Sequence, residues 1–347
     1  MRRPKDRDFV ETVEGLLFCL VGYLHPSMGY TAYLKYIPVA QGKWSRNGVG
    51  YSRTLSYYHV MEVEKTFGFL EEHYPQYLFR CPIRNITIST VPRESVKQYY
   101  VPEERLQEIM MGGRDELEEE VCRLVNFLSD QSGITPKRFG VTGSILLGTH
   151  NPLFSDIDLT VLGTEAAQRV KAALTEARER GGSLVGGLTS EKTENWIREK
   201  TERFPLTREE AKLFLQRRWN YGYWGDRYFS IHPVRRDEEI TEEYGDRRYT
   251  PLGVAEGRGI VTSSRESIFL PAVYRVGDVE IQGWRDVDIR EIVSYEGLYS
   301  DMVREGETAI FKGLVEQVET RDKGLWHRIL IGSTALQGRD YIKPSTD

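Results

Sequence analysis

The spacing of apolar side chains changes along this chain and predicts where its helices and strands lie. Apolar positions at helical intervals, together with helix start signals, predict helices at residues 60–73, 102–111, 114–131, 165–180, 190–203 and 207–219. The third of these has one apolar face, formed by Leu117, Val121, Leu124, Val125 and Leu128. Proline opens the second, at the one helical position where its missing N–H removes no hydrogen bond.

Runs rich in β-branched and aromatic residues predict strands in three parts of the chain. Within residues 8–45, apolar runs flank the turn His25–Gly29, which predicts an antiparallel hairpin. Single strands are expected at residues 82–91, 139–142, 155–161 and 226–234, with a loop at Gly181–Ser183. From about Tyr249 onward, glycines separate short β-like runs at residues 259–262, 268–274, 279–281, 291–295, 308–318 and 326–331.

These elements predict an α+β protein with several domains, and 347 residues suffice for two or three. We expect an N-terminal α+β domain over residues 1–112. Helices and strands alternate over residues 113–248, which predicts an α/β core with a mixed sheet. Residues 249–347 are expected to form a small all-β, barrel-like domain.

Composition narrows the class of protein. With 29% charged and 39% hydrophobic residues, the chain is expected to be globular and soluble. No apolar run approaches the ~18–20 residues of a membrane span, so no membrane partner is expected. Cys19, Cys81 and Cys122 lie far apart and predict neither a disulfide framework nor a zinc site, which favours the cytoplasm. The net charge of −5 argues against a surface that binds nucleic acid throughout, but it allows a local basic cleft.

Two carboxylates on one predicted strand are the strongest chemical signal. Alternate side chains of a strand share a face, so Asp156 and Asp158 point the same way, roughly 7 Å apart. Such a pair is tolerated at a water-exposed edge or around a hard cation, and Mg²⁺ is usually held by one or two carboxylates plus substrate phosphates. Upstream, a short strand runs into Gly143 and Ser144, where the backbone can approach a ligand and its amides can hold a phosphate.

Gly143-Ser144, followed by Asp156-x-Asp158 on a strand, resembles the signature of the nucleotidyltransferase superfamily typified by DNA polymerase β. The resemblance covers roughly residues 115–235. The whole chain also resembles archaeal proteins described as predicted nucleotidyltransferases, through N-terminal runs such as 7–12 and 14–18.

The resemblance implies transfer of a nucleoside monophosphate from a nucleoside triphosphate to a hydroxyl, with Mg²⁺ or Mn²⁺ as cofactor. Asp156 and Asp158 would be the catalytic metal ligands. Gly143 and Ser144 would cradle the β- and γ-phosphates, with help from Thr142 and Ser155.

The family usually places a third carboxylate on a later strand, and here the sequence departs from that pattern. On the strand that matches, Tyr228, Ser230 and His232 share the face that would carry it. His232 could replace the third ligand or act as a base on the acceptor. Asp226 or Asp237 could reach the site instead, or catalysis could be lost.

Basic and aromatic residues gather just before this strand. Arg217 and Arg218 are candidate nucleotide-binding residues, because arginine suits phosphates and neighbouring aromatic rings suit bases. Solvated arginines on an amphipathic helix are the alternative. The N-terminal tyrosines are interpreted as packing residues. The alternative is a base-stacking surface flanked by Lys35, Lys43 and Arg53. The tyrosines are Tyr30, Tyr33, Tyr36, Tyr51, Tyr57 and Tyr58.

Two functions follow from these residues. The first is a metal-dependent nucleotidyltransferase whose acceptor is an RNA 3′ end, a small-molecule alcohol or a protein hydroxyl; the flanking domains favour RNA. The second is a non-catalytic nucleotide- or RNA-binding protein that kept the fold without the third carboxylate. The sequence leaves the base, the acceptor and the oligomeric state open.

Overall fold

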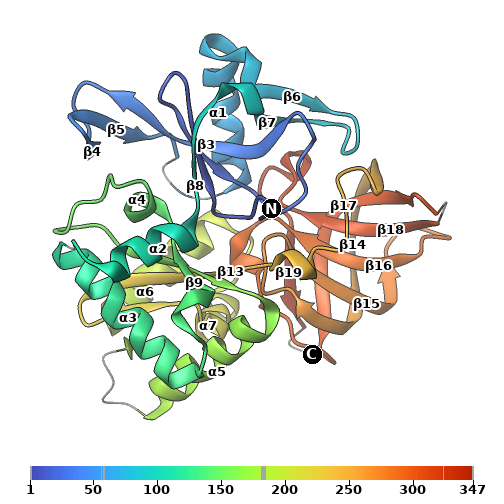
Figure 1. Cartoon of the computed structure of the whole chain (residues 1–347). Coiled ribbons are helices and arrows are strands. Elements are labelled where there is room, and N and C mark those ends of the chain that lie inside the picture. Colours follow the sequence, from blue (N-terminus) through green and yellow to red (C-terminus); the bar gives the residue numbers. More distant parts are fainter. Residues whose placement is uncertain are drawn as a thin grey trace.

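The structure is a computed structural model that describes residues 2–55, 57, 59–113, 115–180, 185–322 and 324–345. Within these residues the strands form three sheets with helices around them, which confirms the predicted α+β class. The N-terminal sheet lies above the central core, and the C-terminal barrel lies beside both (Figure 1). The loop expected at Gly181–Ser183 and Tyr58 lie outside the described residues.

The N-terminal sheet confirms the predicted antiparallel hairpin. Its strands are β1 (Phe9–Thr12), β2 (Leu17–Leu20), β3 (Gly29–Val39), β4 (Trp44–Arg46), β5 (Val49–Arg53), β6 (Leu78–Cys81), β7 (Ile86–Pro92) and β8 (Val96–Tyr100). The order is β4-β5-β3-β2-β1-β8, and β7 pairs with β3 and β6. The strand predicted at 82–91 begins only at Ile86, because residues 82–85 form the β6–β7 turn. Tyr33, Tyr36 and Tyr51 are buried packing residues.

Helix α1 (Val60–His73) covers part of this sheet and has the predicted bounds. Helix α2 (Pro102–Met111) also has its predicted bounds, but its buried Leu106 and Ile109 pack into the central core. The chain therefore passes from the N-terminal sheet to the core before residue 112.

The central core is built on a mixed sheet with the order β11-β12-β13-β10-β9. Its strands are β9 (Phe139–Val141), β10 (Ile157–Leu162), β11 (Val185–Gly186), β12 (Tyr221–Trp224) and β13 (Arg227–Val234). Its helices are α3 (Glu116–Ser132), α4 (Gly143–Leu146), α5 (Thr164–Arg180), α6 (Ser190–Arg203) and α7 (Arg208–Arg217). The apolar side chains of β10 and β13 share one hydrophobic core with α3 and α5.

Strands β10 and β13 run parallel, and their alternating pattern decides what faces the other side of the sheet. Ile157, Leu159 and Val161 are fully buried in the core, so Asp158 points to the opposite face. The register places Asp158 beside Ser230. The second face of the sheet is therefore polar at its centre.

The C-terminal region confirms the predicted all-β domain. Its strands are β14 (Arg247–Glu266), β15 (Ala272–Ile281), β16 (Ile289–Ser294), β17 (Thr308–Thr320), β18 (Leu325–Ile331) and β19 (Tyr341–Pro344). Strand β14 pairs with both β15 and β17, which closes the sheet into a barrel. Ile197 of α6 and Phe214 of α7 lie in the barrel core, so these two helices join the barrel to the central sheet.

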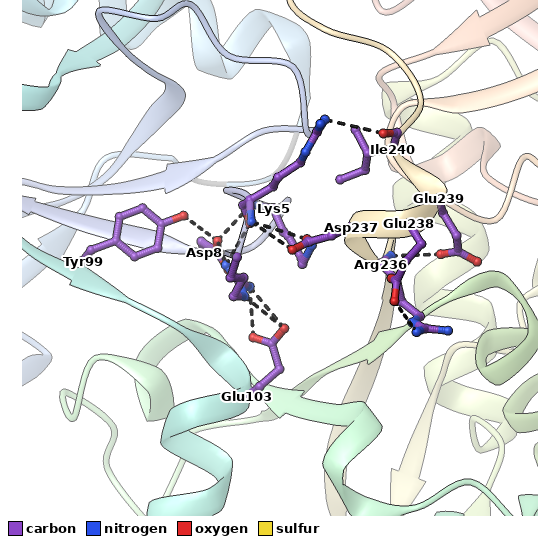
Figure 2. A network of polar contacts seen from close by, with 11 residues as sticks. Lys5, Asp8, Tyr99, Glu103, Arg236, Asp237, Glu238, Glu239 and Ile240 are labelled. Carbon is purple, nitrogen blue, oxygen red and sulfur yellow. Dashed lines mark hydrogen bonds and ion pairs between the residues drawn. The ribbon is translucent and has the colours of Figure 1, made fainter.

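Ion pairs hold the N-terminal segment against the core (Figure 2). Arg2 binds both oxygens of the fully buried Asp8, at 2.6 and 2.7 Å, and reaches Glu103 of α2 at 3.0 Å. Lys5 pairs with Asp237, which follows β13. In the part of the chain that the structure describes, no helix is long and apolar enough to cross a membrane.

Candidate active site

The two aspartates lie at the start of β10, and Asp158 is on the polar face of the central sheet. Asp158 belongs to β10 and its side chain is 31% exposed, while Asp156 precedes the strand and keeps more contact with solvent. Partial burial and the neighbouring carboxylate of Asp158 raise the pKa of Asp156 to about 6, against the opposing effect of Arg53, Arg227 and Lys43. Two neighbouring carboxylates repel each other, so a bound cation would stabilise their ionised forms.

Gly143 brings the turn after β9 directly against Asp158. Its φ is +67°, and a Cβ at this position would lie 2.8 Å from Oδ2 of Asp158. The N–H of Thr142 donates to the carbonyl oxygen of Asp158 at 2.9 Å, which fixes the turn to β10. Only glycine combines this left-handed backbone with such a close approach to a carboxylate. The short helix α4, with the buried Ser144, starts at this point.

The position expected for a third carboxylate is occupied by a serine–histidine pair. The hydroxyl of Ser230 donates to Oδ1 of Asp158 and lies 2.8 Å from Nε2 of His232. Because a hydroxyl has one proton, Ser230 must accept from an Nε2–H of His232. Burial, with Arg7, Lys35 and Arg218 nearby, lowers the pKa of His232 well below its usual value, so the ring is neutral. His232 therefore positions Ser230, and its Nε2 has no lone pair for a metal in this arrangement.

The two other candidates for a third ligand lie beyond the two ends of β13, and Asp226 lines a cleft together with Asp156. Asp237 follows the far end of β13, where it pairs with Lys5 and accepts the N–H of Arg3 (Figure 2). Asp226 is exposed in the turn between β12 and β13. Within the described ranges, no group of three or more His, Cys, Asp or Glu side chains is arranged to hold a metal ion.

The donor set fits a hard cation that also takes ligands from its substrate. Asp156 and Asp158 supply carboxylate oxygens, and the turn at Gly143 lies directly against Asp158. Mg²⁺ and Mn²⁺ bind in this way, with one or two carboxylates and the rest from water and phosphate.

A cleft of about 780 Å³ opens beside Asp156. Lys192, Asp226, Arg227 and Tyr228 are among its lining residues. The cleft is large enough for a nucleotide-sized ligand.

A model of the family described as "Nucleotidyltransferase domain" matches residues 121–219, a range that contains the Gly143 turn and both aspartates. The chain is also 32% identical over 340 residues to an uncharacterized protein of Methanocaldococcus jannaschii, covering 97% of this chain and 98% of that protein. The chain belongs to the nucleotidyltransferase family. No solved structure shows a significant match.

The remaining residues expected at the nucleotidyltransferase site, Arg217, Arg218 and Ser155, have different surroundings in the structure. Arg217 is not brought to the site: it binds both oxygens of Glu307, at 2.6 and 2.7 Å, and joins α7 to the barrel. Arg218 lies beside Tyr221 of β12, with its guanidinium 4.2 Å from the centroid of that ring. Ser155 is buried and accepts the N–H of Asn151 at 3.0 Å, so it shapes the loop before Asp156.

Two residues of this nucleotidyltransferase site were not predicted from the sequence. Arg7 accepts the hydroxyl of Thr142 on its carbonyl oxygen at 2.8 Å and has φ of +72°, which brings the N-terminal segment to the Gly143 turn. Lys192 of α6 stands 3.7 Å from the ring centroid of Tyr223 at the cleft. Arg7 begins one of the N-terminal runs that carry the family resemblance, but neither residue is linked to the site by local pattern, because each meets it only through tertiary contacts.

Proposed function

We propose that the protein is a metal-dependent nucleotidyltransferase that moves a nucleoside monophosphate from a nucleoside triphosphate to a hydroxyl acceptor. The observation that carries the proposal is the contact between the Gly143 turn and Asp158, where a Cβ would lie 2.8 Å from the carboxylate. This contact joins a phosphate-binding turn to a pair of metal-binding carboxylates, as the reaction requires.

Each part of the site has a chemical task. Asp156 and Asp158 would hold Mg²⁺ or Mn²⁺, which, when bound, neutralises the charge that develops on the transferring phosphoryl group. The backbone amides at the start of α4 and the hydroxyl of Ser144 would bind the triphosphate. Ser230 orients the carboxylate of Asp158 by its hydrogen bond, and His232 orients Ser230.

A strip of tyrosines beside the aspartates supports RNA as the acceptor. Tyr221 and Tyr223 of β12 pair with Ser230 and Tyr228 of β13, so these side chains share the face of Asp158. The ring centroids of Tyr223 and Tyr228 are 5.5 Å apart. Aromatic side chains flanked by cations, here Arg218 and Lys192, suit an unpaired base and its phosphate.

The test is label transfer from each of the four ribonucleoside triphosphates to total RNA, with Mg²⁺ or Mn²⁺. The wild type should transfer label, and the double variant Asp156→Asn, Asp158→Asn should not. Asp130→Asn, an exposed change on α3 of the same core, is the matched control and should transfer normally. Transfer that survives in the double variant would refute the proposal.

Ser230 at the place of the third carboxylate favours a second candidate, a nucleotide- or RNA-binding protein without catalysis. Calorimetry with a non-hydrolysable triphosphate, with and without Mg²⁺, separates the two when run beside the transfer assay. Metal-dependent binding without transfer to any acceptor would favour the second candidate.

A further inference from the structure

The hairpin of β4 and β5 lies over the loop that leads to Asp156, although it belongs to the N-terminal sheet. The ring centroids of Trp44 and Phe154 are 6.4 Å apart, and Nζ of Lys43 stands 4.5 Å from the centroid of Phe154. Phe154 precedes Asp156 by two residues and lines the same cleft. In Figure 1 this hairpin projects from the N-terminal sheet above α4.

Hydrogen bonds fix the hairpin to the core. Arg46 of β4 donates to the carbonyl oxygen of Leu147, at the end of α4, at 3.0 Å. The same guanidinium binds Glu11 of β1 at 2.6 Å, and Glu11 is buried. A charge-assisted hydrogen bond to a buried carboxylate holds a side chain firmly, so the position of the hairpin over the site is part of the fold.

The hairpin carries two cations toward the carboxylates. Lys43 and Arg53 are both exposed, and Arg53 lies 4.6 Å from the ring centroid of Trp44. Trp44 in turn contacts Phe154, which lies two residues before Asp156. The hairpin therefore places these two cations beside the rings of Trp44 and Phe154, next to the cleft that Phe154 and Asp156 line.

A bound triphosphate needs such cations. The triphosphate and the two carboxylates together carry more negative charge than one or two divalent metal ions neutralise. Lysine and arginine are the side chains that bind phosphate oxygens. We propose that Lys43 and Arg53 bind the phosphate tail of the nucleoside triphosphate held at Asp156 and Asp158, an inference that rests on the proposed function. The N-terminal sheet, which lies outside the matched family domain, then completes the nucleotide site.

The test is calorimetric binding of non-hydrolysable analogues of the four ribonucleoside triphosphates, and of the matching monophosphates, with Mg²⁺. The double variant Lys43→Gln, Arg53→Gln should raise the triphosphate Kd roughly tenfold or more, because each lost charged hydrogen bond weakens binding by about that factor. The monophosphate Kd should change by less than about twofold, because the β- and γ-phosphates are missing. Both side chains are exposed, so the thermal midpoint should stay near that of the wild type.

The double variant Lys65→Gln, Arg80→Gln is the matched control: it removes the same charge from exposed positions on α1 and β6 and should bind triphosphate normally. Unchanged triphosphate affinity in the Lys43, Arg53 variant would overturn the inference. So would a defect confined to a labelled single-stranded RNA, because the two cations would then serve the acceptor. If the wild type itself binds no triphosphate with Mg²⁺, the proposed function fails and the inference fails with it.

Discussion

Replacing Gly143 by alanine tests whether the turn and the carboxylate form one site. The backbone at Gly143 has φ of +67°, where an L-residue costs about 1–2 kcal/mol. In addition, the new Cβ would lie 2.8 Å from Oδ2 of Asp158, so the carboxylate or the turn must shift. We expect a moderate loss of stability and a much larger loss of activity, of about 10²-fold or more in kcat/KM, because a shift of a few tenths of an ångström misplaces a charged ligand.

Gly148→Ala is the matched control. Gly148 has nearly the same backbone angle, φ +64°, but a Cβ there would meet only Cδ of Arg46, at 3.7 Å. Thermal unfolding should therefore report the same backbone cost in both variants and a larger total destabilisation in Gly143→Ala, while Mg²⁺-dependent triphosphate binding and label transfer should be lost only in Gly143→Ala. Equal activity in the two variants would show that the approach of Gly143 to Asp158 has no part in the chemistry.

Two further predictions test the surroundings of the site and the joint between domains. Ser230→Ala removes a hydrogen bond to the charged Asp158 and should weaken Mg²⁺ binding roughly ten- to a hundredfold. His232→Ala should weaken Mg²⁺ binding less, because His232 acts through Ser230. The opposite order in a Mg²⁺ titration would make His232 a metal ligand. Burial raises the pKa of Glu296, which accepts the N–H of Val60, to about 7. The folded state therefore holds a proton that the unfolded state releases near pH 4.5, and stability should fall by up to about 3 kcal/mol as the pH rises from 4.5 through 7. Glu296→Gln should reduce the slope of stability against pH in thermal melts taken between pH 5 and pH 8, leaving the contribution of other carboxyls with raised pKa such as Asp156, and an unchanged slope would contradict the assignment to Glu296.

Local pattern was sufficient for most helices and for the face that Asp158 takes. The alternation Ile157, Leu159, Val161 predicted that Asp158 faces away from the core, and the fold confirms it, because a two-residue period leaves a buried strand no other register. The prediction places only residues 259–262 of the long strand β14 in a strand, because its first eight residues alternate between half-buried and exposed positions and Leu252 and Val254 stand on the exposed ones.

What the sequence alone determined is the chemistry of the central strand: a glycine-serine turn and two carboxylates at a spacing that predicts a nucleotide site. Tertiary structure alone decided what surrounds them. It turned Arg217 toward Glu307, placed neutral His232 behind Ser230, and brought Arg7 and the β4–β5 hairpin to the site from distant parts of the chain. The physical reason is range: strand alternation acts between neighbouring residues, whereas ion pairs and ring contacts depend on which segments the packed domains bring together.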